Sequence, residues 1–243
     1  MLSIITPVLN GSKFIQKNIE SIQKLTIPYE HIIVDGGSTD GTLDYIKKYD
    51  NIILLHQNDE TGMYGAIHQG FNESNGEYMT WINADDYILK DGYEVMYNKI
   101  FLHKFDLIYS NAIYHFIDKF KYKTMYSRHF GRYLLKQGIM PFAQPSSIFS
   151  KKGYTSIGGL NYKKFKIIGD RDLFQRMAYN KNLKFMCISI NSTVFLQYSN
   201  SLFHRNRELS MRERVFCIKS NANLFNRGIF HISRLIKYLI DLI

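Results

Sequence analysis

Short apolar runs alternate with amphipathic segments through the first third of the chain. Runs rich in β-branched and aliphatic residues predict strands at 2–5, 31–34, 51–55 and 78–82. Apolar residues near helical spacing predict helices over 12–25, 42–49 and 65–72. Strands that alternate with helices are typical of an α/β fold, in which helices cover both faces of a mostly parallel, Rossmann-like central sheet. Ligands of such sheets bind beyond the carboxyl ends of the strands, so we expect a site after Ile5, Val34 and Ile82.

The remaining two thirds of the chain are less regular. The pattern predicts β-segments at 105–114, 122–126, 185–190 and 193–198, a loop at 138–145, and a helix at 173–178. Asp170 is a candidate cap for that helix. From Gly228 onward apolar residues recur at helical spacing with Arg234 and Lys237 on the other side, which predicts a C-terminal amphipathic helix. We therefore expect one α/β domain over residues 1–205 and a helical appendage over 206–243.

The composition supports a folded, basic protein. With 243 residues, of which 45% are hydrophobic, the chain can bury one large core. The formal charge of +10 favours anionic partners: nucleic acid, phosphorylated small molecules or an anionic membrane face. A nucleic-acid-binding protein should gather its basic residues on one element with aromatic platforms, whereas here they are spread along the chain. We therefore expect no nucleic-acid partner.

The two cysteines and the termini bear on the compartment. Cys187 and Cys217 form no CxxC pair, which argues against a disulfide framework and a cysteine-rich zinc site. The N-terminus shows no signal-peptide pattern, and no apolar run of about 18 residues predicts a membrane-spanning helix. We expect a cytoplasmic protein. The amphipathic C-terminal helix leaves open a peripheral contact with the inner face of the cell membrane, or packing in a homodimer.

The first candidate site residue follows the second predicted strand. Asp35 ends that strand and is followed by Gly36 and Gly37. A carboxylate here can accept hydrogen bonds from a nucleobase or a ribose hydroxyl, and the glycines let a ligand approach the backbone. Alternatively this is only a tight turn, in which Thr39 or Asp40 caps the next helix.

A second polar group follows the strand predicted at 78–82. Asn83, Asp85 and Asp86 lie together directly after it, and crowded carboxylates repel each other unless a positive charge lies among them. A hard divalent cation that bridges phosphate oxygens meets that need. The alternative is a polar turn, because Asn and Asp are common turn residues.

Two further carboxylates, Asp170 and Asp172, precede the helix predicted at 173–178. Either can act as the base that deprotonates an acceptor hydroxyl. Both are also suited to capping a helix or to stabilising its dipole. The pattern favours the structural role for Asp172 and leaves both roles open for Asp170.

Taken together, these motifs resemble the family 2 glycosyltransferases of the GT-A fold, from residue 2 to about 198. The stretches that carry the resemblance are SIITPVLN at 3–10, IIVDGGSTDGT at 32–42, DETGMY at 59–64, GEY at 76–78, NADD at 83–86 and GDRDLFQR at 169–176. The likeness is greatest to bacterial enzymes that build surface polysaccharides.

The resemblance implies a role for each matching residue. Thr6, Pro7, Asp35 and Gly37 would bind the nucleotide-sugar donor, with a uridine base by default. Asn83 and Asp85 stand at the Asp-x-Asp motif of the family, so both would contact the donor, and Asp85 would bind Mn²⁺ or Mg²⁺. Asp170 stands at the position of the catalytic base.

Two departures from the family pattern affect these roles. Asn83 replaces the first Asp of the metal motif, which removes a charge, and Gly169 replaces the acidic residue that often precedes the base. The neighbouring Asp172 therefore remains a rival base. Basic residues at 204, 205 and 207 (His204, Arg205 and Arg207) are candidates to stabilise the leaving diphosphate, or they form a solvated loop.

The implied reaction is an inverting transfer of a sugar, a hexose in many such enzymes, from a nucleotide diphosphate to a saccharide or lipid-linked acceptor hydroxyl. A catalytically weak or silent sugar-nucleotide-binding homologue is the alternative that Asn83 keeps open. A nucleotidyltransferase is less well supported, because the segment after the first strand lacks a glycine-rich, basic loop. Residues 109–145 would set the specificity, and their pattern predicts neither donor sugar nor acceptor.

Overall fold

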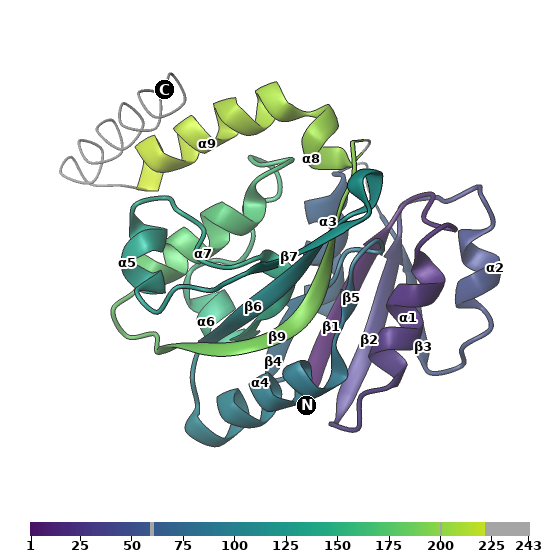
Figure 1. Ribbon diagram of the computed structural model, residues 1–243, viewed down its shortest axis with the longest axis horizontal. Coiled ribbons are helices and arrows are strands. Elements are labelled where there is room, and N and C mark those ends of the chain that lie inside the picture. The colour runs from purple at the N-terminus through teal and green to yellow at the C-terminus, as the bar shows by residue number, and fades with distance from the viewer. Residues whose placement is uncertain (59–60, 200, 222–243) are drawn as a thin grey trace.

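The computed structural model describes residues 1–58, 61–199 and 201–221. Over these residues the strands form a nine-stranded curved sheet with helices on both faces (Figure 1). The amphipathic helix predicted from Gly228 lies outside the described residues. In the described parts of the chain, no helix is both long and apolar enough to cross a membrane.

The strands are β1 (Leu2–Val8), β2 (Tyr29–Asp35), β3 (Ile52–His56), β4 (Tyr78–Trp81), β5 (Tyr87–Ile88), β6 (Leu107–Phe116), β7 (Lys121–Met125), β8 (Ser147–Ser150) and β9 (Phe185–Gln197). The α-helices are α1 (Ile15–Gln23), α2 (Thr42–Ile46), α3 (Met63–Glu73), α4 (Lys90–His103), α5 (Gly131–Lys136), α6 (Lys151–Ser156), α7 (Gly169–Tyr179), α8 (Leu202–Arg205) and α9 (Arg207–Asn221). Short 3₁₀ helices span Ile117–Lys119 (η1) and Gln144–Ser146 (η2).

The predicted α/β fold is confirmed. Strands β3, β2, β1 and β4 lie side by side in that order and are all parallel, as the alternation of strands and helices predicts. Beyond β4 the sheet continues through β8, β6, β9 and β5, and there antiparallel pairs outnumber parallel ones. The parallel half brings the carboxyl ends of β1, β2 and β4 to the same end of the sheet. The carboxyl ends of β6 and β9 lie at that end too.

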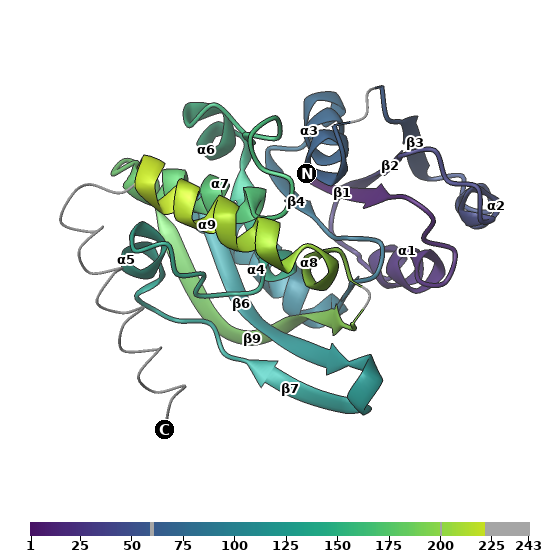
Figure 2. The same ribbon diagram turned by 90° about the horizontal axis from the view of Figure 1, so that it is seen from above.

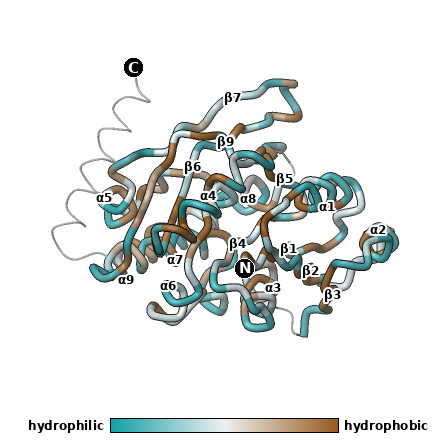
Figure 3. The backbone as a smooth tube through the Cα atoms, turned by 90° about the horizontal axis from the view of Figure 1, so that it is seen from below, coloured by the Kyte–Doolittle hydropathy of each residue, from teal (hydrophilic) through white to brown (hydrophobic). Residues whose placement is uncertain are grey.

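Side chains alternate between the two faces of the sheet. On β1, Leu2 and Ile4 pack with α1 and α4, whereas Ile5 packs with α3 and α7 on the opposite face. Figure 3 shows the tube mostly brown, and so hydrophobic, along central strands such as β1, and mostly hydrophilic around the outer helix α2. The alternation also places Thr6 on the α1 face, the same side as Ile4.

The second half of the chain departs from its pattern at several elements. The two late strands predicted at 185–190 and 193–198 are one strand, β9, because β6 pairs along its whole length and a register shift near Asn111 absorbs the irregularity. Helices α4, α5 and α6 and strand β8 were not predicted. Helix α4 begins with Gly92 in its first turn, where a Cβ would come within 2.1 Å of the Asn191 carbonyl oxygen. Close packing between distant segments therefore selects this glycine.

Candidate active site

Asp35 forms the turn that follows β2. Its buried carboxylate accepts hydrogen bonds from the backbone N–H groups of Gly37, at 2.9 Å, and Ser38, at 3.0 Å. Gly37 has φ of 95°, and a Cβ there would meet nothing within 4 Å. The turn therefore places an open backbone beside the carboxylate, which leaves room for a ligand at the predicted position.

Thr6 lies on β1, near the carboxyl end of the strand. Its hydroxyl hydrogen-bonds with His31 Nε2 at 3.0 Å and donates to Asn18 Oδ1 at 3.4 Å. Burial lowers the pKa of His31 to about 3, so the imidazole is neutral at physiological pH. The Thr6 side chain packs in the core, and Pro7 is also buried, so neither side chain is exposed to a ligand.

Asn18, on α1, is a site residue that the sequence pattern missed. Its side-chain amide donates to the carbonyl oxygens of Asn83, at 3.0 Å, and Asp86, at 2.9 Å. These bonds fix the turn after β4 against α1. The available signal was a buried polar residue among the apolar positions of the predicted helix, such as Ile15 and Ile22.

The two carboxylates of this turn have different surroundings. Asp86 is buried and accepts the Leu196 N–H at 2.9 Å; burial, followed by the charge of Asp85, raises its pKa well above the ordinary value. Asp85 is partly exposed and accepts the Tyr198 hydroxyl at 2.8 Å, and burial raises its pKa as well. Of the two, Asp85 is the carboxylate that a ligand can reach.

The oxygen atoms at this turn suit a hard divalent cation. The Asn83 side-chain oxygen is buried and has no hydrogen-bond partner among the described residues, and it lies in the same turn as the Asp85 carboxylate. Among the described residues no group of three or more His, Cys, Asp or Glu side chains is placed to hold a metal. Mg²⁺ and Mn²⁺ need only one or two protein oxygens when phosphates and water complete the shell, so the residues present fit such an ion.

Asp170 lies in the first turn of α7. That helix begins at Gly169, four residues earlier than predicted, and the predicted cap is wrong, because Ile168 holds the cap position. The Asp170 carboxylate instead accepts the Tyr64 hydroxyl of α3 at 3.1 Å. Burial raises the pKa of Asp170, and the charge of Arg171 opposes that shift. A carboxylate with a raised pKa is suited to accept a proton near neutral pH.

The glycine before Asp170 has a packing reason. A Cβ on Gly169 would lie 3.0 Å from the Tyr64 ring. A larger residue at this position would press on the Tyr64 ring. The segment before α7 is held from the other side by buried Glu213 of α9, which accepts the N–H groups of Lys166, Ile167 and Ile168.

Asp172 is occupied by structural contacts. Its buried Oδ2 lies 2.7 Å from the Arg176 guanidinium and accepts the Asn161 side-chain amide at 2.8 Å. Its Oδ1 accepts the Asn221 side-chain amide at 3.0 Å. A carboxylate with this many internal donors is a poor base for a substrate, so the geometry favours Asp170 over Asp172.

Tyr114 lies on β6. Burial, followed by the charges of Asp86 and Asp170, raises its pKa to about 12. Asp86 belongs to the turn after β4 and Asp170 to the start of α7, and the two residues are 84 positions apart in the sequence.

The basic residues predicted in a loop at 202–207 lie instead in α8 and at the start of α9. Arg205 and Arg207 are exposed. The charge of Arg205 lowers the pKa of Tyr198, which burial and Asp85 raise more strongly.

Known proteins share both the sequence motifs and the fold. Residues 3–158 match the profile of glycosyl transferase family 2. Glycosyltransferase GlyA of Streptococcus pneumoniae is 31% identical over 116 residues, which cover 45% of this chain and 16% of that protein. The poly(ribitol-phosphate) beta-glucosyltransferase of Bacillus spizizenii is 34% identical over 105 residues, which cover 40% of this chain and 17% of that protein. The chain thus spans about a sixth of the length of either relative.

Solved structures show the same fold at low identity. Residues 1–349 of S. aureus TarS in complex with UDP-GlcNAc superpose with a TM-score of 0.70 at 18% identity, covering 94% of this chain and 70% of that one. The mannosyltransferase PcManGT of Pyrobaculum calidifontis, in complex with GDP-Man and Mn²⁺, gives 0.64 at 14% identity, covering 87% of this chain and 61% of that one.

The fold, with acidic side chains after its strands and at the start of α7, defines a protein of the GT-A class. Since the family profile covers more than half of the sequence, the chain belongs to glycosyl transferase family 2.

Proposed function

We propose that the chain is an inverting glycosyltransferase that moves a sugar from a nucleotide diphosphate to an acceptor hydroxyl. The observations that carry the proposal are two carboxylates at predicted positions. The reachable Asp85 lies in the turn after β4 and accepts the Tyr198 hydroxyl, and Asp170 lies at the start of α7 and accepts the Tyr64 hydroxyl. One carboxylate serves the donor phosphates and the other serves the acceptor.

The reaction is a single displacement. Asp170 accepts the proton of the acceptor hydroxyl while that oxygen bonds to the anomeric carbon of the donor sugar. The bond from that carbon to the phosphate oxygen breaks, and its electron pair leaves with the nucleoside diphosphate. Tyr64 orients the Asp170 carboxylate through its hydroxyl, and the exposed Arg205 would offset charge on the leaving group. A Mn²⁺ or Mg²⁺ ion held by Asp85 with Asn83 would supply further electrostatic stabilisation of the diphosphate.

The donor is proposed to be a UDP-sugar, with a hexose as the transferred group. TarS has been solved with UDP and with UDP-GlcNAc, which supports a uridine base, while the archaeal neighbour holds GDP-Man. The backbone at Thr6 and Pro7, the Asp35 carboxylate and the open face of Gly37 would receive the nucleoside. An acceptor in bacterial surface-polysaccharide assembly is in line with the cell-wall polymer named for the Bacillus relative.

Donor binding gives the first test. We expect UDP with Mn²⁺ to raise the melting temperature of the protein more than UDP with a chelator, because Asp85 would hold the ion and the ion would favour binding of the diphosphate. Differential scanning fluorimetry with UDP, GDP and CDP checks both the metal and the base. Equal melting temperatures with and without the metal would remove the ion from the proposed site.

The role of Asp35 can be tested in the same way. We expect Asp35→Ala to weaken UDP binding at least about tenfold, since a hydrogen bond to a charged group contributes roughly 1.5–3 kcal/mol. Calorimetric titration measures the loss, and circular dichroism checks that the sheet is intact. Unchanged UDP affinity would show that the carboxylate only holds the Gly37 and Ser38 turn.

A catalytically weak or silent nucleotide-sugar-binding protein is the second candidate. It is favoured by Asn83, which supplies a neutral amide where the family has a carboxylate. Both candidates bind UDP, so the discriminating measurement is hydrolysis of UDP-sugars in the presence of Mn²⁺. Release of UDP above the uncatalysed rate supports the enzyme, and its absence across a panel of donors supports the silent homologue.

The division into a catalytic domain of 1–205 and an appendage of 206–243 is likewise proposed. In the described part of the appendage, α9 packs on α7 and buries Cys217 and Ile218. We also propose that the protein attaches to the inner face of the cell membrane, uses a lipid-linked acceptor and forms a homodimer.

A further inference from the structure

An exposed aromatic and basic surface lies along the β6–β7 hairpin and the start of α5. Phe120 at the hairpin tip is 92% exposed, Tyr126 after β7 is 68% exposed, and Phe130 before α5 is 79% exposed. Tyr133 adds a further exposed ring. Tyr122 is exposed as well, but the alternation along β7 places its ring, which stacks on His115, on the opposite face from Lys121 and Lys123. The views of Figures 1 and 2 place α5 on the side of the molecule away from α2, and β7 runs from the hairpin tip toward α5. We name this surface, residues 119–133, the hairpin face.

The charge of the hairpin face has one sign. No Asp or Glu occurs between Lys119 and Gly169. Basic residues are spread along the whole sequence, but in this segment no acidic residue offsets them. The exposed cations of the hairpin face are Lys119, Lys121, Lys123 and Arg128. In the described parts of the chain no ion pair joins any of them to a carboxylate.

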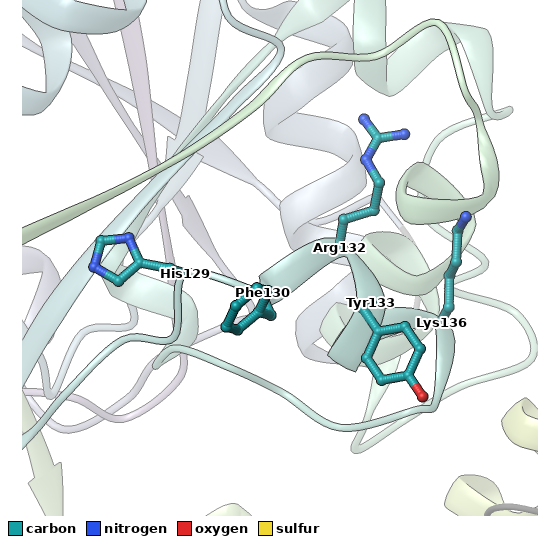
Figure 4. Close-up of a pocket in the computed structure, with 5 residues that line it drawn as sticks. All are labelled: His129, Phe130, Arg132, Tyr133 and Lys136. Carbon is teal, nitrogen blue, oxygen red and sulfur yellow. The ribbon is translucent and has the colours of Figure 1, made fainter.

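The α5 end of this face contains a shallow hollow (Figure 4). Its lining residues are His129, Phe130, Arg132, Tyr133 and Lys136. Arg132 is committed to the protein, because it donates to the Asn180 carbonyl oxygen at 3.1 Å and lies over the Phe185 ring. The exposed groups at the hollow are therefore two aromatic rings and an imidazole, and the half-buried Lys136 places its ammonium over the Tyr179 ring.

Protection of an edge strand does not explain this face. Among the strands that the structure describes, β7 pairs only with β6, and lysines on such an edge discourage pairing with other chains. The exposed rings work against that purpose. Phe120 also has φ of 47°, a left-handed conformation that glycine or asparagine adopts more easily than a bulky side chain. A phenylalanine kept there, and exposed, indicates a use outside the folded chain.

We propose that the hairpin face docks on an anionic phospholipid bilayer. Aromatic rings favour the headgroup level of a bilayer, and lysines place their apolar stems against it while the ammonium groups meet lipid phosphates. Charge complementarity therefore selects an anionic surface, and the rings select one with an apolar interior. A soluble anionic polymer would neutralise the charge of the lysines but would leave the aromatic rings exposed to water.

The docking would bring the proposed active site to the membrane. Asp118 at the hairpin tip accepts the Ser199 N–H at 2.8 Å, and the preceding residue, Tyr198, donates to Asp85. The tip is thus tied to the donor site. This benefit rests on the proposed transferase function, whereas the docking does not.

The test is co-sedimentation of the full chain with vesicles of phosphatidylcholine, with or without phosphatidylglycerol. We expect binding to the anionic vesicles, weakened by salt. Combining Lys119→Glu, Lys121→Glu and Lys123→Glu should reduce the partition coefficient at least about tenfold. Combining Phe120→Ser and Phe130→Ser should reduce it at unchanged charge. Matched controls are Lys24→Glu, Lys47→Glu and Lys48→Glu together, and Leu102→Ser, which change exposed side chains elsewhere and should bind like the parent.

Any of the following outcomes would contradict docking of the hairpin face on a membrane. Hairpin variants that bind like the parent would move membrane contact elsewhere in the chain. Tight binding of soluble polyphosphate that Phe120→Ser does not weaken, without vesicle binding, would identify an anionic polymer as the partner. A change of oligomeric state in the serine variants, seen by light scattering, would identify a second copy. UDP-dependent melting shifts in the same variants report folding and donor binding, so failure of the docking is distinguishable from failure of the proposed function.

Discussion

Asp170→Asn is expected to lower turnover at least about a hundredfold while leaving UDP affinity within about twofold of the parent. The amide cannot accept the acceptor proton, and the carboxylate has no proposed contact with the nucleotide. The amide can still accept the Tyr64 hydroxyl, so the geometry at the start of α7 should persist. Release of UDP from the donor in the presence of acceptor measures turnover, and calorimetric titration measures affinity.

The pH dependence of turnover provides a control for the role of Asp170 as the base. A base acts only when deprotonated, and burial raises the pKa of Asp170, so the rate of the parent should fall as the pH drops through that raised value. Tyr64→Phe removes a hydrogen bond that favours the ionised form, so it should move the fall to higher pH. Near-normal turnover in Asp170→Asn, with a folded but inactive Asp172→Asn, would transfer the base to Asp172.

Asp172→Ala is expected to lower the free energy of unfolding by roughly 3 kcal/mol, the scale for breaking a buried ion pair by removal of one partner. Arg176, whose side chain is only 17% exposed, would lose its carboxylate, and the Asn161 and Asn221 amides would lose an acceptor. Urea unfolding followed by circular dichroism measures the change. Asp170→Asn is the matched control on the same helix and should change stability by less than about 1 kcal/mol.

A double variant separates the ion pair from the packing. Because Arg176→Met leaves no unpaired cation, the Asp172→Ala and Arg176→Met double variant should be more stable than Asp172→Ala alone. Equal stability of the single and double variants would mean that the charge of Arg176 is not what Asp172 stabilises. Full stability in Asp172→Ala would reopen its candidacy as the base.

Local pattern predicted the parallel half of the fold because each of its elements is specified by nearby residues. The strands β1 to β4 are short apolar runs, and the turn after β2 is set by Asp35 and its glycines. Fold class and family membership are both confirmed. The positions of Asp85 and Asp170 at element ends were also readable, since loop composition and strand ends are local features, although their roles remain proposals.

The tertiary structure decided the rest, because the deciding contacts join residues far apart in the chain. Asn18 reaches the turn at Asn83, Tyr64 reaches Asp170, and Tyr198 reaches Asp85. The same holds for β9, which is one strand only because β6 pairs along all of it. By itself the sequence determined which residues carry charge at the ends of strands and helices. Only packing determined which of those charges are neutralised inside the protein, as at Asp172, and which face the site, because burial and partner choice depend on segments that the local pattern does not relate.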